Sequence, residues 1–292
     1  MQAKMKIYRF ILLIALCFAL GQPAKAIKIG LFTNYKDTIT VGVSSGGVMQ
    51  NAKTGEYILV MEAMKPYWLE SKGDYIKLTV DKKRYKLPSN EIIIKPTKNN
   101  GVVYAKKHWY KGHFLVTNSR NGLTLINDVD MEDYLKGVVP SEMPASWNQE
   151  AHKAQAIAAR SYAIANLGKR LEYGYDLNDT PQDQNYLGVS RRTTKTDGAV
   201  EATRGQVLVY NDKVIRAYYC ASAGGQTASP KDVWGSALPY LESVKSFDEN
   251  VGKKGHGVGM SQHGANNLAN MGYDAYQILG YFYKNVLLRK MY

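Results

Sequence analysis

The sequence predicts an α+β fold: an N-terminal β-rich lobe, followed by a mixed lobe in which a buried alanine-rich helix packs on antiparallel strands. Three patterns lead to this prediction. Short runs of β-branched and aromatic residues, separated by glycine-containing turns, fill residues 27–117. Residues 147–167 contain neither proline nor glycine and predict one long helix. Two further strand-like runs, 207–210 and 214–219, follow that helix.

The first 26 residues have the layout of a secretory signal peptide. Lys4, Lys6 and Arg9 precede the apolar run 10–20, and the Ala-Lys-Ala triplet at 24–26 offers small residues at a cleavage site. The run is too short to span a bilayer comfortably. We therefore expect signal peptide 1–26 and export to the cell wall or the outer face of the membrane. An uncleaved anchor, which would add membrane contact, is the alternative.

Export limits the partners and the redox chemistry of the mature chain. Removing residues 1–26 takes away four cations and lowers the formal net charge from +13 to +9. An exported chain has little access to nucleic acid, so its basic character favours an anionic wall or membrane surface. Only Cys220 remains after cleavage, which excludes an intramolecular disulfide.

The β-rich lobe is expected over residues 27–108. Its strand-like runs are 27–32, 38–43, 57–61, 75–80 and 92–94. No residues in this lobe have catalytic spacing. Its aromatic and basic side chains fit a solvated sheet face as well as they fit a wall-binding surface.

The second domain is expected over residues 109–292 and opens with a hairpin. Its strands, 114–116 and 123–126, flank the pair Asn121-Gly122, which suits a turn that needs positive φ. The further elements are predicted in this order: a helical start at 130–135, the long helix, a polar loop at 175–188, a short helix through Ala199 and Ala202, the two strands, a glycine-rich segment at 255–264, and a last helix that begins at Asp274.

One glutamate lies between two prolines just before the long helix. Pro140 and Pro144 bracket Glu142. Because proline fixes its own φ and disfavours helical geometry in the preceding residue, we expect Glu142 on a stiff, non-helical segment. Ser146 and Gln149 then form a capping-box signature, and the helix extends to about Arg170. Seven alanines lie around nearly its whole circumference, so we expect burial on several sides: Ala151, Ala154, Ala156, Ala158, Ala159, Ala163 and Ala165.

A set of short segments occurs in a fixed order along the second domain: 123–127 with 132–135, 137–144 (GVVPSEMP), 150–162 (EAHKAQAIAARSY), 222–227 (SAGGQT), 234–235 with 239–241, and 255–262 (GHGVGMSQ). Together these segments, which cover about residues 110–283, resemble the family of the stage II sporulation protein D (SpoIID) and the amidase enhancer LytB. The combination is far more specific than any single short motif.

The resemblance implies a lytic transglycosylase that cleaves the β-1,4 glycan strands of peptidoglycan to 1,6-anhydro-muramic ends. It implies Glu142 as the essential acid and no cofactor. For sporulation members it implies strands already stripped of stem peptides and work beside a cell-wall amidase during engulfment. Some members have cysteine and histidine zinc ligands in the loop 176–186, where this chain has Asn178, Gln182 and Asp183. We therefore expect no metal there.

A single carboxyl group can carry out such a reaction. Glu142 would first protonate the leaving oxygen and then take the proton of the muramic acid 6-hydroxyl as the anhydro ring closes. This requires a partly desolvated carboxyl, with which the apolar neighbours Val139 and Met143 are compatible. The alternative is a structural glutamate that caps the following helix.

Eight further residues are candidates for substrate binding: Gln155, Arg160 and Tyr162 on the long helix, Gln184 and Tyr186 in the polar loop, and His256, Ser261 and Gln262 in the glycine-rich segment. For the three helix residues, sugar contact and a role as buried groups that tie the helix to nearby loops are both open. Arg160 is the first candidate for a sugar contact or for shaping the field at Glu142. His256 and Gln262 would bind sugar hydroxyls or support Glu142.

Two other functional classes stay open. Cys220 with His256 would suit a cysteine peptidase or amidase acting on wall peptides, although Cys220 also fits a small buried residue at a strand end. The second class is a non-catalytic wall-binding protein that enhances an N-acetylmuramoyl-L-alanine amidase. The expected partners are thus peptidoglycan glycan strands and a cell-wall amidase.

Overall fold

The computed structural model describes residues 26–292, and the predicted signal segment lies outside them except for Ala26. Helices and antiparallel sheets occur together, which confirms the α+β class. The described residues divide into two compact units: the β-rich unit (residues 26–145 and Asn166–Asp197) and the mixed unit (Ser146–Ala165 and Gly198–Tyr292). No helix within residues 26–292 is long and apolar enough to cross a membrane.

The domain limits expected from the sequence are not the limits of these units. The boundary between residues 108 and 109 lies inside the β-rich unit, in strand β10 (His108–Tyr110). Compactness alone does not define a family domain, so the division into 27–108 and 109–292 stays a prediction.

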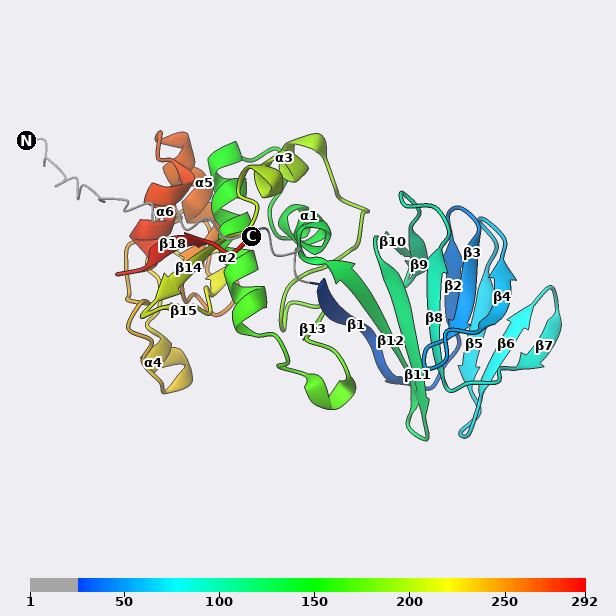
Figure 1. Cartoon of the computed structure of the whole chain (residues 1–292). Helices are drawn as coiled ribbons and strands as arrows, with labels where there is room; N and C mark the ends of the chain where they lie inside the picture. The colour runs from blue at the N-terminus through cyan, green and yellow to red at the C-terminus, as the bar shows by residue number, and fades with distance from the viewer. Residues whose placement is uncertain (1–25) are drawn as a thin grey trace, which may run out of the picture. The chain divides into compact units, whose positions relative to one another are not determined.

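Two sheets form the β-rich unit (Figure 1). A seven-stranded sheet has the order β13-β1-β12-β11-β8-β3-β4, and a six-stranded sheet has the order β10-β9-β2-β5-β6-β7. Contacts between β12 and β5 and between β8 and β9 join the two sheets. The strands are β1 (Ala26–Tyr35), β2 (Ile39–Val43), β3 (Gly47–Asn51), β4 (Tyr57–Met61), β5 (Tyr67–Ser71), β6 (Ile76–Val80), β7 (Lys83–Lys86), β8 (Glu91–Pro96), β9 (Val103–Ala105), β10, β11 (His113–Ser119), β12 (Gly122–Asp130) and β13 (Leu177–Asn178).

All five strands expected before residue 108 are present, and so is the hairpin that follows. In that hairpin, Ser119 of β11 lies opposite Gly122 of β12. Gly122 adopts φ 127°, and a Cβ atom there would lie 2.5 Å from the carbonyl oxygen of Tyr35. A side chain would therefore be strained and would clash with β1, which explains the glycine at this turn.

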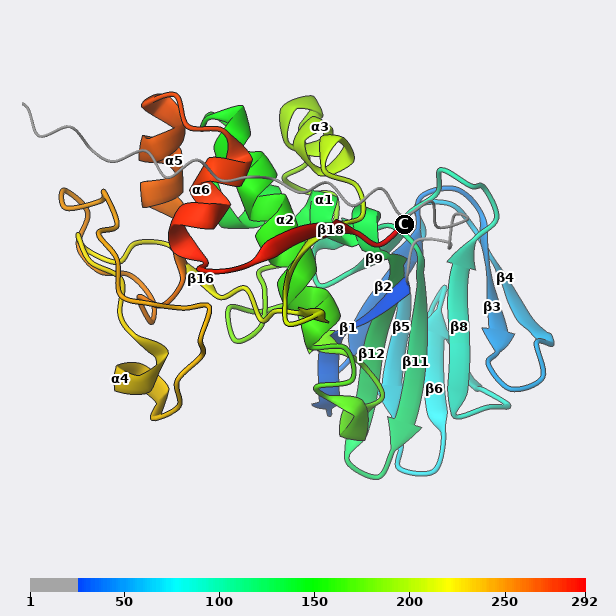
Figure 2. The ribbon, with the colours of Figure 1, turned by 60° about the vertical axis from the view of Figure 1, so that its left-hand side comes forward.

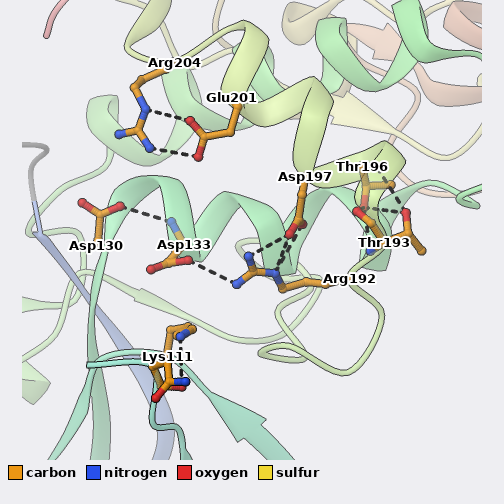
Figure 3. A network of polar contacts seen from close by, with 10 residues as sticks. Lys111, Asp130, Asp133, Arg192, Thr193, Thr196, Asp197, Glu201 and Arg204 are labelled. Carbon is orange, nitrogen blue, oxygen red and sulfur yellow. Dashed lines mark hydrogen bonds and ion pairs between the residues drawn. The ribbon is translucent and has the colours of Figure 1, made fainter. Parts of the chain in front are cut away.

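Helix α1 (Met131–Glu142) contradicts the expectation of a non-helical segment around Glu142. The Asp130 side chain caps its start by accepting from the backbone N–H of Glu132 and of Asp133. Figure 3 shows the bond from Asp133. Pro140 lies inside the helix, and the backbone N–H of Met143 still donates to the carbonyl of Val139 at 3.0 Å across this turn. The side chain of Ser141 adds a bond, in which Oγ donates to the carbonyl of Gly137 at 2.7 Å. Burial of one face of α1 thus outweighs the local preference of proline. The helix ends only at Met143, directly before Pro144.

The alanine-rich helix α2 (Gln149–Ala165) is the centre of the mixed unit (Figure 2). It packs against β14 and β15 of the antiparallel sheet β15-β14-β18 and against α5 and α6. Six of its seven alanines are fully buried, and Ala165 is half-buried. The helix begins two residues later and ends earlier than expected, and Asn148 Oδ1 accepts from the N–H of Glu150 at its start.

Most of the remaining elements follow the sequence, but the single strand expected at 214–219 is wrong, because β15 ends at Val214 and β16 begins only at Tyr219. The last helix, α6, is capped by Asp274 and Gln277 in a reciprocal capping box, as expected. The elements are η1 (Leu171–Tyr173), α3 (Thr194–Ala202), β14 (Gln206–Tyr210), β15 (Lys213–Val214), β16 (Tyr219–Cys220), α4 (Pro230–Trp234), β17 (Met260–Ser261), α5 (Gln262–Asn270), α6 (Ala275–Phe282) and β18 (Leu287–Lys290).

Candidate active site

Glu142 is the last residue of helix α1 and is half-buried. Its Oε1 atom accepts a hydrogen bond from the backbone N–H of Asn185, with an N···O distance of 2.8 Å. Asn185 belongs to the polar loop that the sequence analysis expected near the substrate. The end of α1 and this loop, far apart in sequence, therefore meet at the carboxylate of Glu142.

Close packing between α1 and the loop fixes this contact. A Cβ atom on Gly137 would lie 2.5 Å from Cε2 of Tyr186 and 2.6 Å from the carbonyl oxygen of Gly188, so only glycine allows the approach. The hydroxyl of Tyr134 donates to Gln184 Oε1 at 3.1 Å. The rings of Tyr134 and Tyr186 lie 4.8 Å apart. The loop on both sides of Asn185 thus packs on one face of α1.

Gln184 and Tyr186, two predicted substrate ligands, are both buried. The hydroxyl of Tyr186 donates to Asn127 Oδ1 at 2.9 Å, and burial holds its pKa well above the ordinary value. Asn127 Nδ2 in turn donates to the carbonyl of Lys111. These contacts hold the loop that carries Asn185. Direct contact of either side chain with sugar stays a prediction.

The base of the loop is closed by Asp183. Its buried carboxylate pairs with Lys169 at 2.5 Å and Arg170 at 2.6 Å and accepts from the N–H of Asn178. Burial raises the pKa of Asp183, but these hydrogen bonds outweigh it and leave the pKa below its ordinary value. Asn178 Nδ2 donates to Gln182 Oε1. The three positions considered for zinc ligands therefore take part in hydrogen bonds and ion pairs.

A second ion-pair cluster anchors the end of the same segment. Arg192 pairs with Asp133 near the start of α1 and with Asp197 (Figure 3). Burial lowers the pKa of Arg192, but its two carboxylate partners outweigh this and raise it. No group of three or more histidine, cysteine, aspartate or glutamate side chains within residues 26–292 is arranged to hold a metal ion.

In the mixed unit, Arg160 is fully buried. Its guanidinium donates to the backbone carbonyls of Gln206 at 3.1 Å and of Val200 at 3.4 Å. Ser161 Oγ accepts from the N–H of Leu208 at 2.9 Å. These bonds tie α2 to β14 and to the end of α3, which is the structural role that the sequence left open. A sugar contact of Arg160 stays a prediction.

Gln155 differs from its neighbours on α2. It is fully buried, and neither its Nε2 nor its Oε1 forms a hydrogen bond within residues 26–292. Burying an amide atom without a partner costs about 1–3 kcal/mol. Gln155 is therefore the candidate on this helix whose hydrogen-bonding capacity is not used by the fold.

The other candidate on α2, Tyr162, belongs to an aromatic cluster with His256. The rings of Tyr162 and Tyr218 lie 5.7 Å apart, and those of Tyr218 and His256 lie 6.0 Å apart. Trp234 completes the cluster, 4.6 Å from Tyr218 and 5.1 Å from His256. Neither Tyr218 nor Trp234 was a candidate for the site from the sequence. Only the placement of Trp234 in a family segment could have indicated it.

His256 is neutral near pH 7 in this cluster. Its Nδ1 accepts from the backbone N–H of Val258 at 3.0 Å. Burial and then the positive charge of Lys253 lower its pKa below the ordinary value, against a smaller effect of a hydrogen bond with the Tyr219 backbone. His256 therefore offers a neutral, hydrogen-bonded ring rather than a charge.

Asp248, which the sequence analysis missed, connects two of the family segments. Its buried carboxylate accepts from Ser222 Oγ (2.9 Å), Ser261 Oγ (2.5 Å), Ser246 Oγ and the N–H groups of Ala223 and Gly225 (both 2.7 Å). Burial raises the pKa of Asp248, but these bonds outweigh it and lower the pKa to about 2. Ser261 also caps α5 through the N–H of Gly264. The hydroxyl of Ser261 is thus engaged in the fold, and Gln262 is the buried first residue of α5.

Cys220 is not arranged as a nucleophile. It is 5% exposed, and burial raises the pKa of its thiol to about 12. The thiolate needed for catalysis is therefore almost absent near pH 7. This argues against the cysteine peptidase hypothesis.

Comparison with known proteins identifies a family model and several relatives that are similar to this chain. The model of the stage II sporulation protein family, SpoIID, matches residues 119–210. The amidase enhancer of Bacillus subtilis is 47% identical over 111 residues, which are 38% of this chain and 15% of that protein. The stage II sporulation protein D of the same organism is 37% identical over 136 residues, 41% of this chain and 40% of that protein. Part of the chain thus matches the SpoIID family, and the chain is similar to proteins named amidase enhancer and stage II sporulation protein D.

The SpoIID match covers part of the candidate site. Its range, 119–210, contains Glu142, the loop with Asn185, and helix α2, but ends before Tyr218, Trp234 and Asp248. An uncharacterised protein of Brachyspira hyodysenteriae is 37% identical over 163 residues, 55% of this chain and 44% of that protein. The chain thus spans less than half the length of each of these relatives.

Proposed function

We propose that this protein is a peptidoglycan lytic transglycosylase in which Glu142 is both the acid and the base. The observation that carries the proposal is the fixed position of the Glu142 carboxylate, at the end of α1 with Oε1 held by the Asn185 N–H, inside the segment that matches the SpoIID family. A catalytic carboxyl needs such a rigid support, because its geometry must be held within a fraction of an ångström.

The hydrogen bond from Asn185 distinguishes the two carboxyl oxygens. Since Oε1 accepts this N–H, the acidic proton belongs on Oε2. In the first step the proton passes from Oε2 to the glycosidic oxygen, and the bond between that oxygen and C1 of N-acetylmuramic acid breaks. The carboxylate then takes the proton of the C6 hydroxyl as O6 bonds to C1. The product is a 1,6-anhydro end, and the acid is regenerated without water or cofactor.

The remaining candidates would bind the glycan strand or position the groups that bind it. Gln155, with its unused amide atoms, is the first candidate for a hydrogen bond to a sugar. Tyr162 and His256 contribute rings to the cluster around Tyr218. Five further candidates are buried, and we propose that they position other groups of their own unit. They are Gln184 and Tyr186 in the β-rich unit, and Arg160, Ser261 and Gln262 in the mixed unit.

The proposed location is the cell wall. Export through the segment 1–26 would give the protein access to peptidoglycan, and relatives named for sporulation and for amidase enhancement fit a role in wall remodelling. Strands stripped of stem peptides are the proposed substrate, supplied by a cell-wall amidase as partner.

A non-catalytic enhancer of such an amidase is the second candidate. The 47% identity to a protein named amidase enhancer favours it, because that value is higher than the identity to stage II sporulation protein D. Under this alternative the protein binds the wall, and the amidase does the chemistry.

Mass spectrometry of soluble products separates the two. The mature chain, its Glu142→Gln variant and a Glu172→Gln control would be incubated with peptidoglycan that has and has not been stripped of stem peptides. Glu172 is an exposed glutamate of the same unit and is a matched control for the charge change. We expect anhydro-ended glycans from the wild type and the control, and none from Glu142→Gln.

Other outcomes would overturn the proposal. Full activity of Glu142→Gln would exclude the mechanism, and a reducing end in the product would indicate a hydrolase. If no variant releases product, but the wild type increases the release of stem peptides by an added amidase, the enhancer function is correct.

A further inference from the structure

We infer that Trp234, Tyr218 and Lys253 of the mixed unit form a subsite for an N-acetylmuramic acid residue that carries a free lactyl carboxylate. The inference rests on the proposed function for the identity of the polymer. Its geometry comes from the mixed unit alone. The subsite would explain how this protein distinguishes stripped strands from intact ones.

The aromatic part of the subsite is the partly exposed indole of Trp234, which has two ring neighbours. Trp234 is the last residue of α4, and Gly235 ends that helix with φ 75°. The indole is 42% exposed although it packs against the rings of Tyr218 and His256. One face of a pyranose ring consists largely of C–H groups, which pack favourably on an aromatic face and remove apolar surface from water.

The support beneath Trp234 is rigid. The carbonyl of Tyr218 accepts from the hydroxyl of Tyr283 at 2.8 Å and from the N–H of Met260 at 3.1 Å. A Cβ atom on Gly259 would lie 1.9 Å from that same carbonyl oxygen, so the backbone of the glycine-rich segment packs directly on Tyr218. A preorganised aromatic surface binds with a smaller loss of conformational entropy than a mobile one.

A cation lies next to these rings. The side chain of Lys253 packs over Gly257, where a Cβ atom would lie 2.8 Å from Lys253 Cε and 3.2 Å from Nζ. Gly257 follows His256, whose pKa is lowered in part by the charge of Lys253. Lys253 is exposed, and none of the ion pairs within residues 26–292 includes it. Its ammonium group is therefore available to an anion at the edge of the aromatic cluster.

The chemistry of peptidoglycan determines which anion this is. In intact strands the lactyl group of N-acetylmuramic acid forms an amide with the stem peptide and carries no charge. Amidase hydrolysis of that amide releases the peptide and leaves a carboxylate. A lysine beside the sugar platform can form an ion pair with the lactyl group only when the sugar is stripped, because the amide of the intact sugar has no charge. Trp234 would thus supply affinity for the sugar ring, and Lys253 would supply discrimination.

Calorimetric titration of the mature chain with the Glu142→Gln substitution tests this without cleavage of the ligand. The three ligands are soluble stripped glycan strands, the same strands with the lactyl carboxylate reduced to an alcohol, and chitohexaose. We expect Lys253→Gln to weaken binding of stripped strands about fivefold and to change the other two less than twofold. We expect Trp234→Ala to weaken all three roughly tenfold, and Trp234→Phe to weaken them less.

Matched controls are available in the same unit. Lys213→Gln removes another exposed cation, and Tyr276→Ala removes another partly exposed aromatic ring. Neither should change any of the three affinities by more than twofold. The far-ultraviolet circular dichroism spectrum and unfolding midpoint of each variant show whether the mixed unit is intact, and Trp234→Phe keeps an aromatic ring if Trp234→Ala is unstable.

Two results would overturn the inference. An equal effect of Lys253→Gln on stripped and carboxyl-reduced strands would exclude the carboxylate contact, and unchanged binding by the Trp234 variants would exclude the platform. Product analysis is a separate measurement. If binding behaves as expected but the wild type forms no anhydro ends, the proposed reaction is wrong and the subsite stands. If strands are cleaved but these variants bind normally, only the subsite is wrong.

Discussion

Replacing Asp248 with asparagine should destabilise the mixed unit strongly, because asparagine cannot accept all the hydrogen bonds that converge on this carboxylate. The N–H of Ala223 donates to Oδ2 and the N–H of Gly225 donates to Oδ1. Whichever way the amide is placed, its NH₂ group faces one of these two backbone donors. A serine hydroxyl can rotate to become an acceptor, but a backbone N–H cannot. One buried N–H therefore loses its partner, at a cost of about 1–3 kcal/mol.

The lowered pKa of Asp248 gives a second measure of the same hydrogen bonds. The fall in the pKa of Asp248 from 3.8 to about 2 corresponds to roughly 2.5 kcal/mol of stability at neutral pH. Because the folded pKa is lowered, this stability is present above the unfolded pKa near 4 and is lost as pH falls from about 4 to about 2. Both measures agree, and we therefore expect Asp248→Asn to lower the free energy of unfolding by about 2–3 kcal/mol at pH 7.

Urea unfolding of both proteins between pH 7 and pH 2 measures this. The difference between wild type and Asp248→Asn should be constant from pH 7 to pH 5 and should shrink below pH 4. Asp212→Asn is the control, since Asp212 is exposed and pairs only with Arg289 among the ion pairs of residues 26–292. A difference below 1 kcal/mol at pH 7, or one that does not change between pH 5 and pH 2, would refute the assignment of Asp248 as the connection between the two segments.

Three more predictions concern Gly137, Cys220 and Asp183. Gly137→Ala should lower the free energy of unfolding by more than about 1 kcal/mol and reduce glycan cleavage, because its Cβ would displace Tyr186 and the loop with Asn185. Gly252→Ala is the control and should change neither quantity, since the space around Gly252 is open. Chemical denaturation measures the stability of both variants, and product analysis measures their cleavage. Cys220→Ala should leave glycan cleavage unchanged between pH 6 and pH 8, because the buried thiol is protonated in this pH range. Loss of cleavage in this variant would restore the peptidase hypothesis. Asp183→Asn should lower the unfolding midpoint more at pH 7 than at pH 2.5, because a carboxylate with a lowered pKa loses its contribution to stability as the pH falls below the ordinary pKa. An equal loss at both pH values would contradict its ion pairs.

The elements with regular patterns could be predicted from the sequence, and those set by tertiary contacts could not. The capping box of α6 and the hairpin β11–β12 depend on neighbouring residues alone, and both were correct. Strand β3 was missed because its Gly47 reads as part of a turn, while in the fold it pairs with Met61 and Pro96 on two neighbouring strands. The helical conformation of Pro140 was missed for the same reason: packing, rather than local preference, decides it.

In the candidate site, too, some residues could be predicted from the local sequence and others depend on tertiary contacts. Glu142 could be selected from its sequence neighbourhood, but Asn185, which holds its carboxylate, is a polar residue in a polar loop and has no distinguishing pattern. Asp248 is equally indistinct, since its five donors come from three separate segments. Such residues form hydrogen bonds with partners far away in the sequence. They can be found only when the fold is known.

The path of the chain explains why the expected boundary at residue 108 does not coincide with a limit of the compact units. The β-rich unit takes back Asn166–Asp197 after α2 has been contributed to the mixed unit, so neither unit is one continuous piece. Strand β12 pairs with β1 over seven residue pairs, and β11 pairs with β8. A fragment that began at residue 109 would therefore leave both outer edges of the β11–β12 hairpin unpaired, directly before the helix that carries Glu142. The β strands before residue 108 thus stabilise the candidate catalytic residue, although none of them supplies a candidate side chain.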